Sequence, residues 1–105
     1  MRRLTRRSWK ATSQTAIYRL ELMPSALADM KALPADVRQR IGDATGRLTE
    51  DPQPSTSKRL KGSLARFWRL RVGDYRVSYT VDHEARFVRV WRVGHRGTFY
   101  KRLQH

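Results

Sequence analysis

The sequence predicts one α+β domain with the element order β-α-α-β-β-β, in which an αα-hairpin covers one face of an antiparallel sheet. Three observations support this class. The chain has 105 residues, of which 39% are hydrophobic, and this is enough for one core but too little for a second. Apolar residues recur at helical spacing between positions 24 and 48. They recur at alternate positions in strand-like runs after position 66.

The first strand and both helices are expected in the first half of the chain. Residues 17–22 alternate bulky apolar with polar side chains, as a strand with one buried face does. Pro24 suits the first turn of a helix, and Leu27, Met30 and Leu33 would form its apolar face. Pro34 ends that helix and begins a second one. Its apolar residues follow steps of four, three and four: Val37, Ile41, Ala44 and Leu48.

Three further strands are expected in the second half. Residues 51–57 are rich in Pro and Ser and predict a loop, which leads into a basic segment at 58–62. Residues 67–72 and 75–81 each have an apolar face and an Arg-bearing face, and the Gly73-Asp74 pair predicts a hairpin turn between them. Residues 86–93 form the last strand. Its alternation is blurred, as in a central strand that is covered on both sides.

The same alternation divides the aromatic and basic side chains of these strands. Four aromatic residues are expected in the core: Trp68, Tyr75, Tyr79 and Trp91. Arg89 and Arg92 are interpreted as charges on a solvated face. Arg71 is either a ligand contact or a charge at the edge of the sheet.

The net charge of +14 points to a polyanionic or acidic partner, because self-repulsion at this density destabilises an isolated domain. Residues 17–53 carry five basic and six acidic groups, whereas residues 54–105 carry thirteen basic and three acidic groups. Of the 23 basic residues 18 are Arg, which binds phosphate oxygens in a bidentate manner and stacks on bases. A nucleic-acid-binding surface is therefore expected in the second half.

Other features limit the location and the chemistry. The chain has no Cys, which removes disulfides and thiolate metal sites and agrees with a reducing cytoplasm. The three His residues lack partners at ligand spacing, and no apolar run reaches the length of a membrane span. We therefore expect a cytoplasmic protein with no metal, no cofactor and no membrane association.

The N-terminal segment is treated separately from the domain. Residues 1–16 carry five basic and no acidic groups, and they lack the apolar stretch of a secretory signal. This segment is either a flexible phosphate-binding arm or an extension upstream of the true start. The folded domain is expected at residues 17–105.

The expected open face of the sheet carries the groups of a phosphate-binding platform. It would present Arg69, Arg71 and Arg76, with Arg96 and Tyr100 following the last strand, and bases could stack on Phe67 or Tyr100. Cleavage of RNA without a metal requires a base for the 2′-OH, cations to stabilise the phosphorane and a proton donor to the leaving 5′-oxygen. The chain supplies many cations and few proton carriers.

Several motifs in order resemble the RelE/ParE toxin superfamily over nearly all of residues 17–102. They are the element order, the basic segment 58–62, the run WRLRVGDYRVSY at 68–79, and VGHR at 93–96 followed by Phe99 and Tyr100. The resemblance implies a compact fold like that of microbial RNases and a cognate antitoxin that neutralises the protein. In the RNA-cleaving branch it also implies action on mRNA in the ribosomal A site.

The resemblance also implies roles for individual residues. Arg76 matches an Arg that binds the substrate and the transition state, and Arg96 matches a second Arg at the scissile phosphate. Tyr100 matches a catalytic Tyr, and Arg69 matches a basic RNA contact. The remaining positions of the expected RNA-binding surface are Lys58, Lys61, Phe67 and Arg71.

One position departs from the pattern of the family. Phe67 stands where well-known members have a catalytic Lys, so another group must replace it, and Lys61 and His95 are the candidates. An unperturbed imidazole titrates near neutrality, whereas an Arg is effectively never deprotonated and a Tyr titrates near 10. We therefore hypothesise that His95 shares the acid or base role with Tyr100.

Two other functions remain open. The first is a gyrase poison of the ParE type, which would share the fold without RNA chemistry. Arg76, Arg96 and Tyr100 favour the nuclease, while Phe67 favours the gyrase poison. The second is a non-catalytic module that binds nucleic acid by charge alone.

Overall fold

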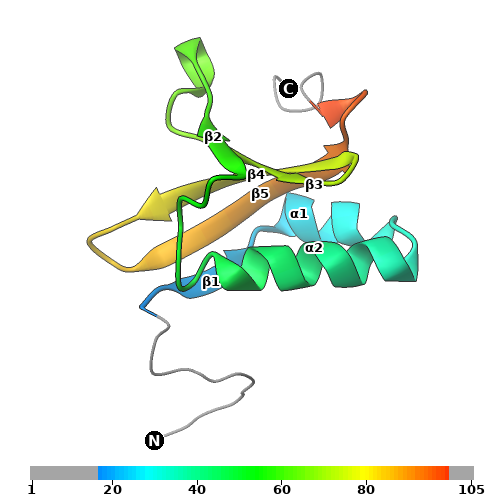
Figure 1. Cartoon of the computed structure of the whole chain (residues 1–105), viewed down its shortest axis with the longest axis horizontal. Coiled ribbons are helices and arrows are strands. Elements are labelled where there is room, and N and C mark those ends of the chain that lie inside the picture. Colours follow the sequence, from blue (N-terminus) through cyan, green and yellow to red (C-terminus); the bar gives the residue numbers. More distant parts are fainter. Residues whose placement is uncertain (1–16, 100–105) are drawn as a thin grey trace, which may run out of the picture.

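The computed structural model describes residues 17–99, which contain a five-stranded sheet and two α-helices (Figure 1). The α+β class and the order of the predicted elements are confirmed. The N-terminal segment 1–16 and Tyr100 lie outside the described residues. The elements are β1 (Arg19–Leu22), α1 (Pro24–Lys31), α2 (Ala35–Arg47), β2 (Ser57–Arg59), the 3₁₀ turn η1 (Gly62–Leu64), β3 (Trp68–Val72), β4 (Tyr75–Asp82) and β5 (Phe87–His95).

The sheet has the strand order β1-β5-β4-β3-β2 and is mixed. Strands β3, β4 and β5 pair in antiparallel fashion as predicted, and β2 pairs with β3 in the same way, but β1 pairs with β5 in parallel. Strand β2 was also missed, because its Ser-Lys-Arg sequence has no apolar alternation and follows a loop rich in breakers. Both differences lie at the edges of the sheet, where little of a strand is buried.

Both helices lie on one side of the sheet, and the segment from β2 to η1 rises on the other side (Figure 1). The core fills the space between the helices and the sheet. Tyr79 is buried there as predicted, and Trp68 and Tyr75 pack against the core. The buried apolar residues of this core cluster are Tyr18, Ala26, Val37, Ile41, Leu48, Leu70, Val77, Tyr79, Val88, Val90 and Val93.

The apolar face that the Leu and Met spacing predicts for helix α1 is only partly turned inward, because Met30 and, just after the helix, Leu33 pack against the core but Leu27 does not. Leu27 is 49% exposed, whereas Ala26 and Asp29 are buried. Because β1 ends at Leu22, the second half of β5 has no neighbouring strand on that side. Asp29 accepts the backbone N–H of Val93 (2.9 Å), and the Ser25 hydroxyl donates to the carbonyl of Trp91 (2.6 Å). Polar side chains of α1 thus satisfy backbone groups that a strand would otherwise pair.

A β-bulge in β5 explains its blurred alternation. Ser78 pairs with Arg92 and Tyr79 pairs with Val90, so Trp91 is an extra residue on β5. Val88 and Val90 point to the core before the bulge, and Val93 does so after it. The prediction that Trp91 lies in the core was wrong. Its indole N–H donates to the hydroxyl of Thr80, on the face opposite the helices.

Candidate nucleic-acid interface

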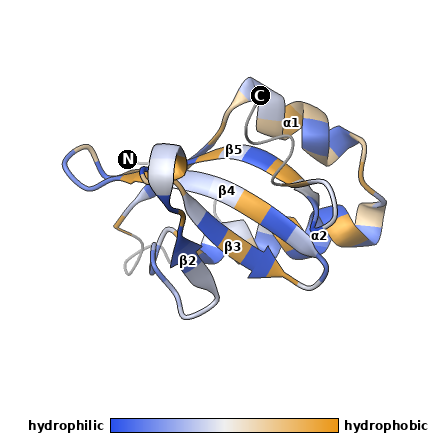
Figure 2. Cartoon of the chain, turned by 90° about the horizontal axis from the view of Figure 1, so that it is seen from above, coloured by the Kyte–Doolittle hydropathy of each residue, from blue (hydrophilic) through white to orange (hydrophobic). Residues whose placement is uncertain are grey.

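The face of the sheet that is turned away from the helices, here called the open face, collects the predicted Arg residues. Arg71 pairs directly with Arg76 across β3 and β4, and Arg76 pairs with Gly94 of β5. Arg69 pairs with Lys58 of β2 and with Ser78 of β4. These side chains alternate with buried Leu70 and Val77, and Figure 2 shows hydrophilic and hydrophobic bands along β3 and β4.

Arg96 extends this face beyond the end of β5. Its backbone N–H donates to the carbonyl of Asp74 (2.8 Å), which continues the β4–β5 pairing by one position. Residues 74, 76, 94 and 96 therefore share one side of the hairpin, by the two-residue period of a strand. The Arg96 Nε lies 4.0 Å from the Asp74 carboxylate, and both side chains are about two-thirds exposed, so the pair is weak.

Local hydrogen bonds hold the Arg76 side chain against the β3–β4 turn. Its Nη1 donates to the carbonyl of Gly73 (2.8 Å) and to that of Tyr75 (2.9 Å). Gly73 has a φ of +59°, which fits the first central position of a type II′ hairpin turn. The predicted turn is confirmed, and it sets the position of the Arg76 guanidinium.

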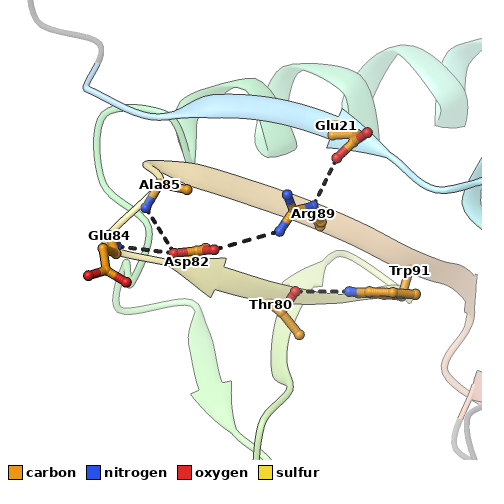
Figure 3. A network of polar contacts seen from close by, with 7 residues as sticks. All are labelled: Glu21, Thr80, Asp82, Glu84, Ala85, Arg89 and Trp91. Carbon is orange, nitrogen blue, oxygen red and sulfur yellow. Dashed lines mark hydrogen bonds and ion pairs between the residues drawn. The ribbon is translucent and has the colours of Figure 1, made fainter.

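The Arg residues of the sheet fall into two groups that differ in their partners. Arg89 pairs with Glu21 (2.9 Å) and lies 4.0 Å from Asp82 (Figure 3), and Arg92 pairs with buried Asp29 (3.0 Å). The interpretation of Arg89 and Arg92 as merely solvated charges was therefore wrong. Within residues 17–99, no carboxylate lies within 4.0 Å of the second group, which consists of Lys58, Arg69, Arg71 and Arg76.

Arg69 has an unusual environment among these residues. Its Nε is buried and has no hydrogen-bond partner among the described residues. A buried donor without a partner costs free energy unless a ligand supplies an acceptor. An anionic ligand on the open face would provide that acceptor.

Tyr79 anchors the loop that leads into β2 and its Lys58. The Tyr79 hydroxyl donates to the carbonyl of Pro52 (2.6 Å). Burial raises the pKa of Tyr79 to about 12. A hydrogen bond with Ser57 lowers this pKa in part, and the nearby negative charge of Asp51 raises it further. The hydroxyl therefore stays protonated at neutral pH and ties the loop to the core.

One predicted site residue, His95, lies apart from the open-face Arg group. His95 pairs with Tyr75, and their rings meet edge to face with centroids 5.5 Å apart. Since Tyr75 packs against the core, His95 extends from the helix side of the sheet, where it lines a cavity of about 540 Å³ between α1 and β5. Lys61 is exposed just before η1. Tyr100 lies beyond the last described residue, the buried Phe99.

Comparison with known proteins gives a consistent result. Residues 20–100 match the family described as the ParE toxin of the type II toxin–antitoxin system, parDE. The chain is a RelE/ParE-family toxin. The toxin is 30% identical to the putative toxin RelE1 of Methanocaldococcus jannaschii, over 80% of this chain and 96% of the relative. It is 31% identical to toxin RelG of Mycobacterium tuberculosis, over 81% and 98% of the two chains.

Solved structures agree with this assignment. The toxin is similar to a chain of the RelBE2 toxin–antitoxin complex of Mycobacterium tuberculosis, with a TM-score of 0.69 and 30% identity over 74% of this chain and 96% of that chain. The isolated RelE toxin of E. coli gives a TM-score of 0.64 at 23% identity, over 82% and 98%, and this likeness shows the fold alone. Within residues 17–99, no helix is long and apolar enough to cross a lipid bilayer.

Proposed function

We propose that this toxin is a metal-independent endoribonuclease that cuts mRNA in the ribosomal A site. The observation that carries the proposal is the open-face cluster of Lys58, Arg69, Arg71 and Arg76, which has no carboxylate partner among the described residues. Nearby Arg89 and Arg92 are paired with acids. Cations without acidic partners, on a sheet face that neither α1 nor α2 covers, are suited to bind a phosphate backbone.

The reaction would proceed by attack of a ribose 2′-oxygen on the adjacent phosphorus, with loss of the 5′-oxygen of the next nucleotide. Negative charge grows on the phosphoryl oxygens in this step, so fixed guanidinium groups stabilise the transition state more than the ground state. We assign this role to Arg76, which the turn holds in place, and to Arg96 on the same side of the hairpin. Lys58, Arg69 and Arg71 would bind the flanking phosphates.

Proton transfer needs groups other than guanidinium. Phe67 occupies the position of the family Lys, so we assign the acid and base roles to Tyr100 and to Lys61, which is exposed. His95 lies with Tyr75 on the helix side, and this placement does not support the role predicted for it. Cleavage by His95→Ala at the parental rate would agree with this assignment, whereas a large loss would return His95 to the mechanism.

The proposed partner is a cognate antitoxin, and the proposed place of action is the cytoplasm, where ribosomes translate. The similar structures include toxin–antitoxin complexes from Mycobacterium tuberculosis and Pyrococcus horikoshii, which supports such a partner. An acidic or amphipathic segment would complement the basic open face and block access to RNA.

Inhibition of gyrase is the second candidate, because the matched family is named for ParE and because Phe67 replaces the catalytic Lys. Purified toxin should be assayed in parallel on ribosomes programmed with a defined message and on gyrase. Codon-phased cuts would support the nuclease, and inhibited supercoiling without cuts would support the gyrase poison. Binding to RNA with neither effect would leave a non-catalytic module.

A further inference from the structure

Three side chains form a cluster of rings and positive charge on the open face. The rings of Phe67 and Trp91 meet edge to face at 90°, with centroids 6.2 Å apart. The Arg66 guanidinium carbon lies 4.8 Å from the centre of the Phe67 ring and 5.6 Å from that of Trp91. We call Arg66, Phe67 and Trp91 the aromatic plate.

The aromatic plate is held in a fixed orientation. The Trp91 indole N–H donates to the hydroxyl of Thr80 (2.9 Å), as Figure 3 shows. The bulge in β5 turns Trp91 toward this face, and Phe67 leads directly into β3. A binding surface whose rings are already oriented loses less conformational entropy when a ligand binds.

The plate is separate from the core of the protein. Phe67 and Trp91 are half-buried, and neither belongs to the cluster of residues that packs between the sheet and the helices. Neither α1 nor α2 covers this side of the sheet, and the segment from β2 to η1 rises from it (Figure 1). The rings therefore present apolar surface where a ligand can reach it, and packing of the core does not explain their position.

Phosphate-binding groups lie beside the plate. Phe67 and Arg69 are two residues apart along one extended segment, so their Cα atoms are about 7 Å apart on the same face. Arg69 has the buried Nε without a partner, and Lys58 lies opposite it on β2. A ligand with a flat aromatic group next to an anionic group would satisfy both features.

We propose that the aromatic plate is a base-stacking subsite for single-stranded RNA. One unpaired base of the message stacks on the outer side of the Arg66 guanidinium, which lies over the rings of Phe67 and Trp91, while Arg69 and Lys58 bind the adjacent phosphate. The inference rests on the proposed function and adds a subsite that determines specificity. Stacking strength rises with the size of the ring system, so the subsite favours a purine over a pyrimidine.

The test uses the full-length toxin and short single-stranded RNA with 2′-O-methyl riboses, which cannot be cut by 2′-oxygen attack. An abasic position is moved along the oligonucleotide, and binding is measured by fluorescence anisotropy. Loss of the stacked base should weaken binding by roughly 5- to 150-fold at one position. The same abasic position should have little effect on Trp91→Leu, because that variant has lost one of the two rings that hold the Arg66 guanidinium in place.

Two further variants make the result decisive. Arg66 is exposed, so Arg66→Ala should fold normally and lower affinity for the intact RNA while reducing the abasic effect. Phe87→Leu is the matched control, because Phe87 lies further along the open face beneath its own Arg89 (4.8 Å). This control should bind RNA like the parent and keep the full abasic effect. Thermal unfolding of each variant verifies that it is folded.

The subsite and the nuclease can fail separately. Abasic effects of equal size in the parent and in folded Arg66→Ala and Trp91→Leu would overturn the subsite. Unchanged codon preference of those variants on the ribosome would also overturn it and leave the nuclease standing. If the parent cuts no ribosome-bound message, the nuclease proposal fails, and the oligonucleotide measurements still decide whether the plate stacks a base.

Discussion

Asp29 of α1 and Arg92 of β5 form a two-pronged ion pair, with Nε–Oδ2 and Nη2–Oδ1 distances of 3.0 and 3.2 Å. The Asp29 side chain is 4% exposed and that of Arg92 is 31% exposed. Asp29 also accepts the backbone N–H of Val93, so one carboxylate joins the helix to the strand that carries the bulge. The pair thereby fixes the edge of the sheet from which Trp91 and Arg96 extend.

Asp29→Ala should lower the free energy of unfolding by about 2 to 4 kcal/mol, because it leaves Arg92 and the Val93 N–H without this acceptor. Urea denaturation measures the change. The control is Glu21→Ala, which breaks the more exposed pair with Arg89 and should cost less than about 1 kcal/mol. Equal losses in the two variants would contradict the structural role assigned to Asp29.

Tyr79→Phe should change how stability depends on alkaline pH. The pKa of Tyr79 is raised to about 12 from its ordinary value near 10, so the native state holds the proton more tightly than the unfolded state. The tighter proton binding contributes about 2 to 3 kcal/mol to the free energy of unfolding. This contribution is complete below pH 10 and is lost as the pH rises through 12.

The Tyr79→Phe variant should therefore show a shallower loss of unfolding free energy between pH 10 and 12 than the parent. At neutral pH it should already be about 1 to 2 kcal/mol less stable, since the Pro52 carbonyl loses its donor. Denaturant titrations at a series of pH values measure both effects. Parallel pH profiles for the two proteins would contradict the account.

Gly73→Ala should destabilise the β3–β4 hairpin by about 1 kcal/mol, because φ at this position is +59° and a side chain there is strained. An added Cβ would meet only the far end of the flexible Arg40 side chain, at 3.4 Å, so the cost comes from the backbone conformation. Gly42 occupies an exposed position of α2 with open space around it, so Gly42→Ala should instead be neutral or stabilising. Thermal unfolding compares the two, and a neutral Gly73→Ala would argue against the turn.

Arg71→Ala should lower the salt dependence of RNA binding. Each phosphate contact that is lost reduces the slope of log K against log salt by about 0.7 for a single strand. Arg47 is an exposed residue in the last turn of α2, on the other side of the sheet. Arg47→Ala removes one positive charge there and should leave the slope almost unchanged. Affinities for single-stranded RNA measured at several salt concentrations give the slopes, and equal slopes in the two variants would place the RNA elsewhere.

Strong periodicity made most of the fold predictable from the sequence. The steps in α2 and the alternation in β3 and β4 follow burial on one side, and the structure places Ile41, Leu70 and Val77 inside as expected. The edges were not predictable in the same way. Strand β2 is short and polar, and the parallel pairing of β1 with β5 joins segments that are distant in the chain.

The candidate site shows the same division. Alternation placed Arg69, Arg71 and Arg76 on one face, but one extra residue in β5 reversed the side assigned to Trp91. The mixed sequence around Arg89 and Arg92 was the available signal of a bulge. The partners of Arg92 could not be inferred, because Asp29 lies 63 positions away and replaces a missing strand.

Cleavage of ribosome-bound message by Arg96→Ala and by Arg47→Ala tests whether the open-face Arg residues catalyse the cutting of RNA. Both variants lose one positive charge from an exposed position, but only Arg96 lies beside Arg76 on the open face. Mapping of 5′ ends on programmed ribosomes should show codon-phased cuts by the parent and by Arg47→Ala. Arg96→Ala should cut at least 100-fold more slowly, roughly the loss expected for one transition-state contact, with little change in thermal stability. Cuts of equal rate by both variants, or none by the parent, would contradict the account.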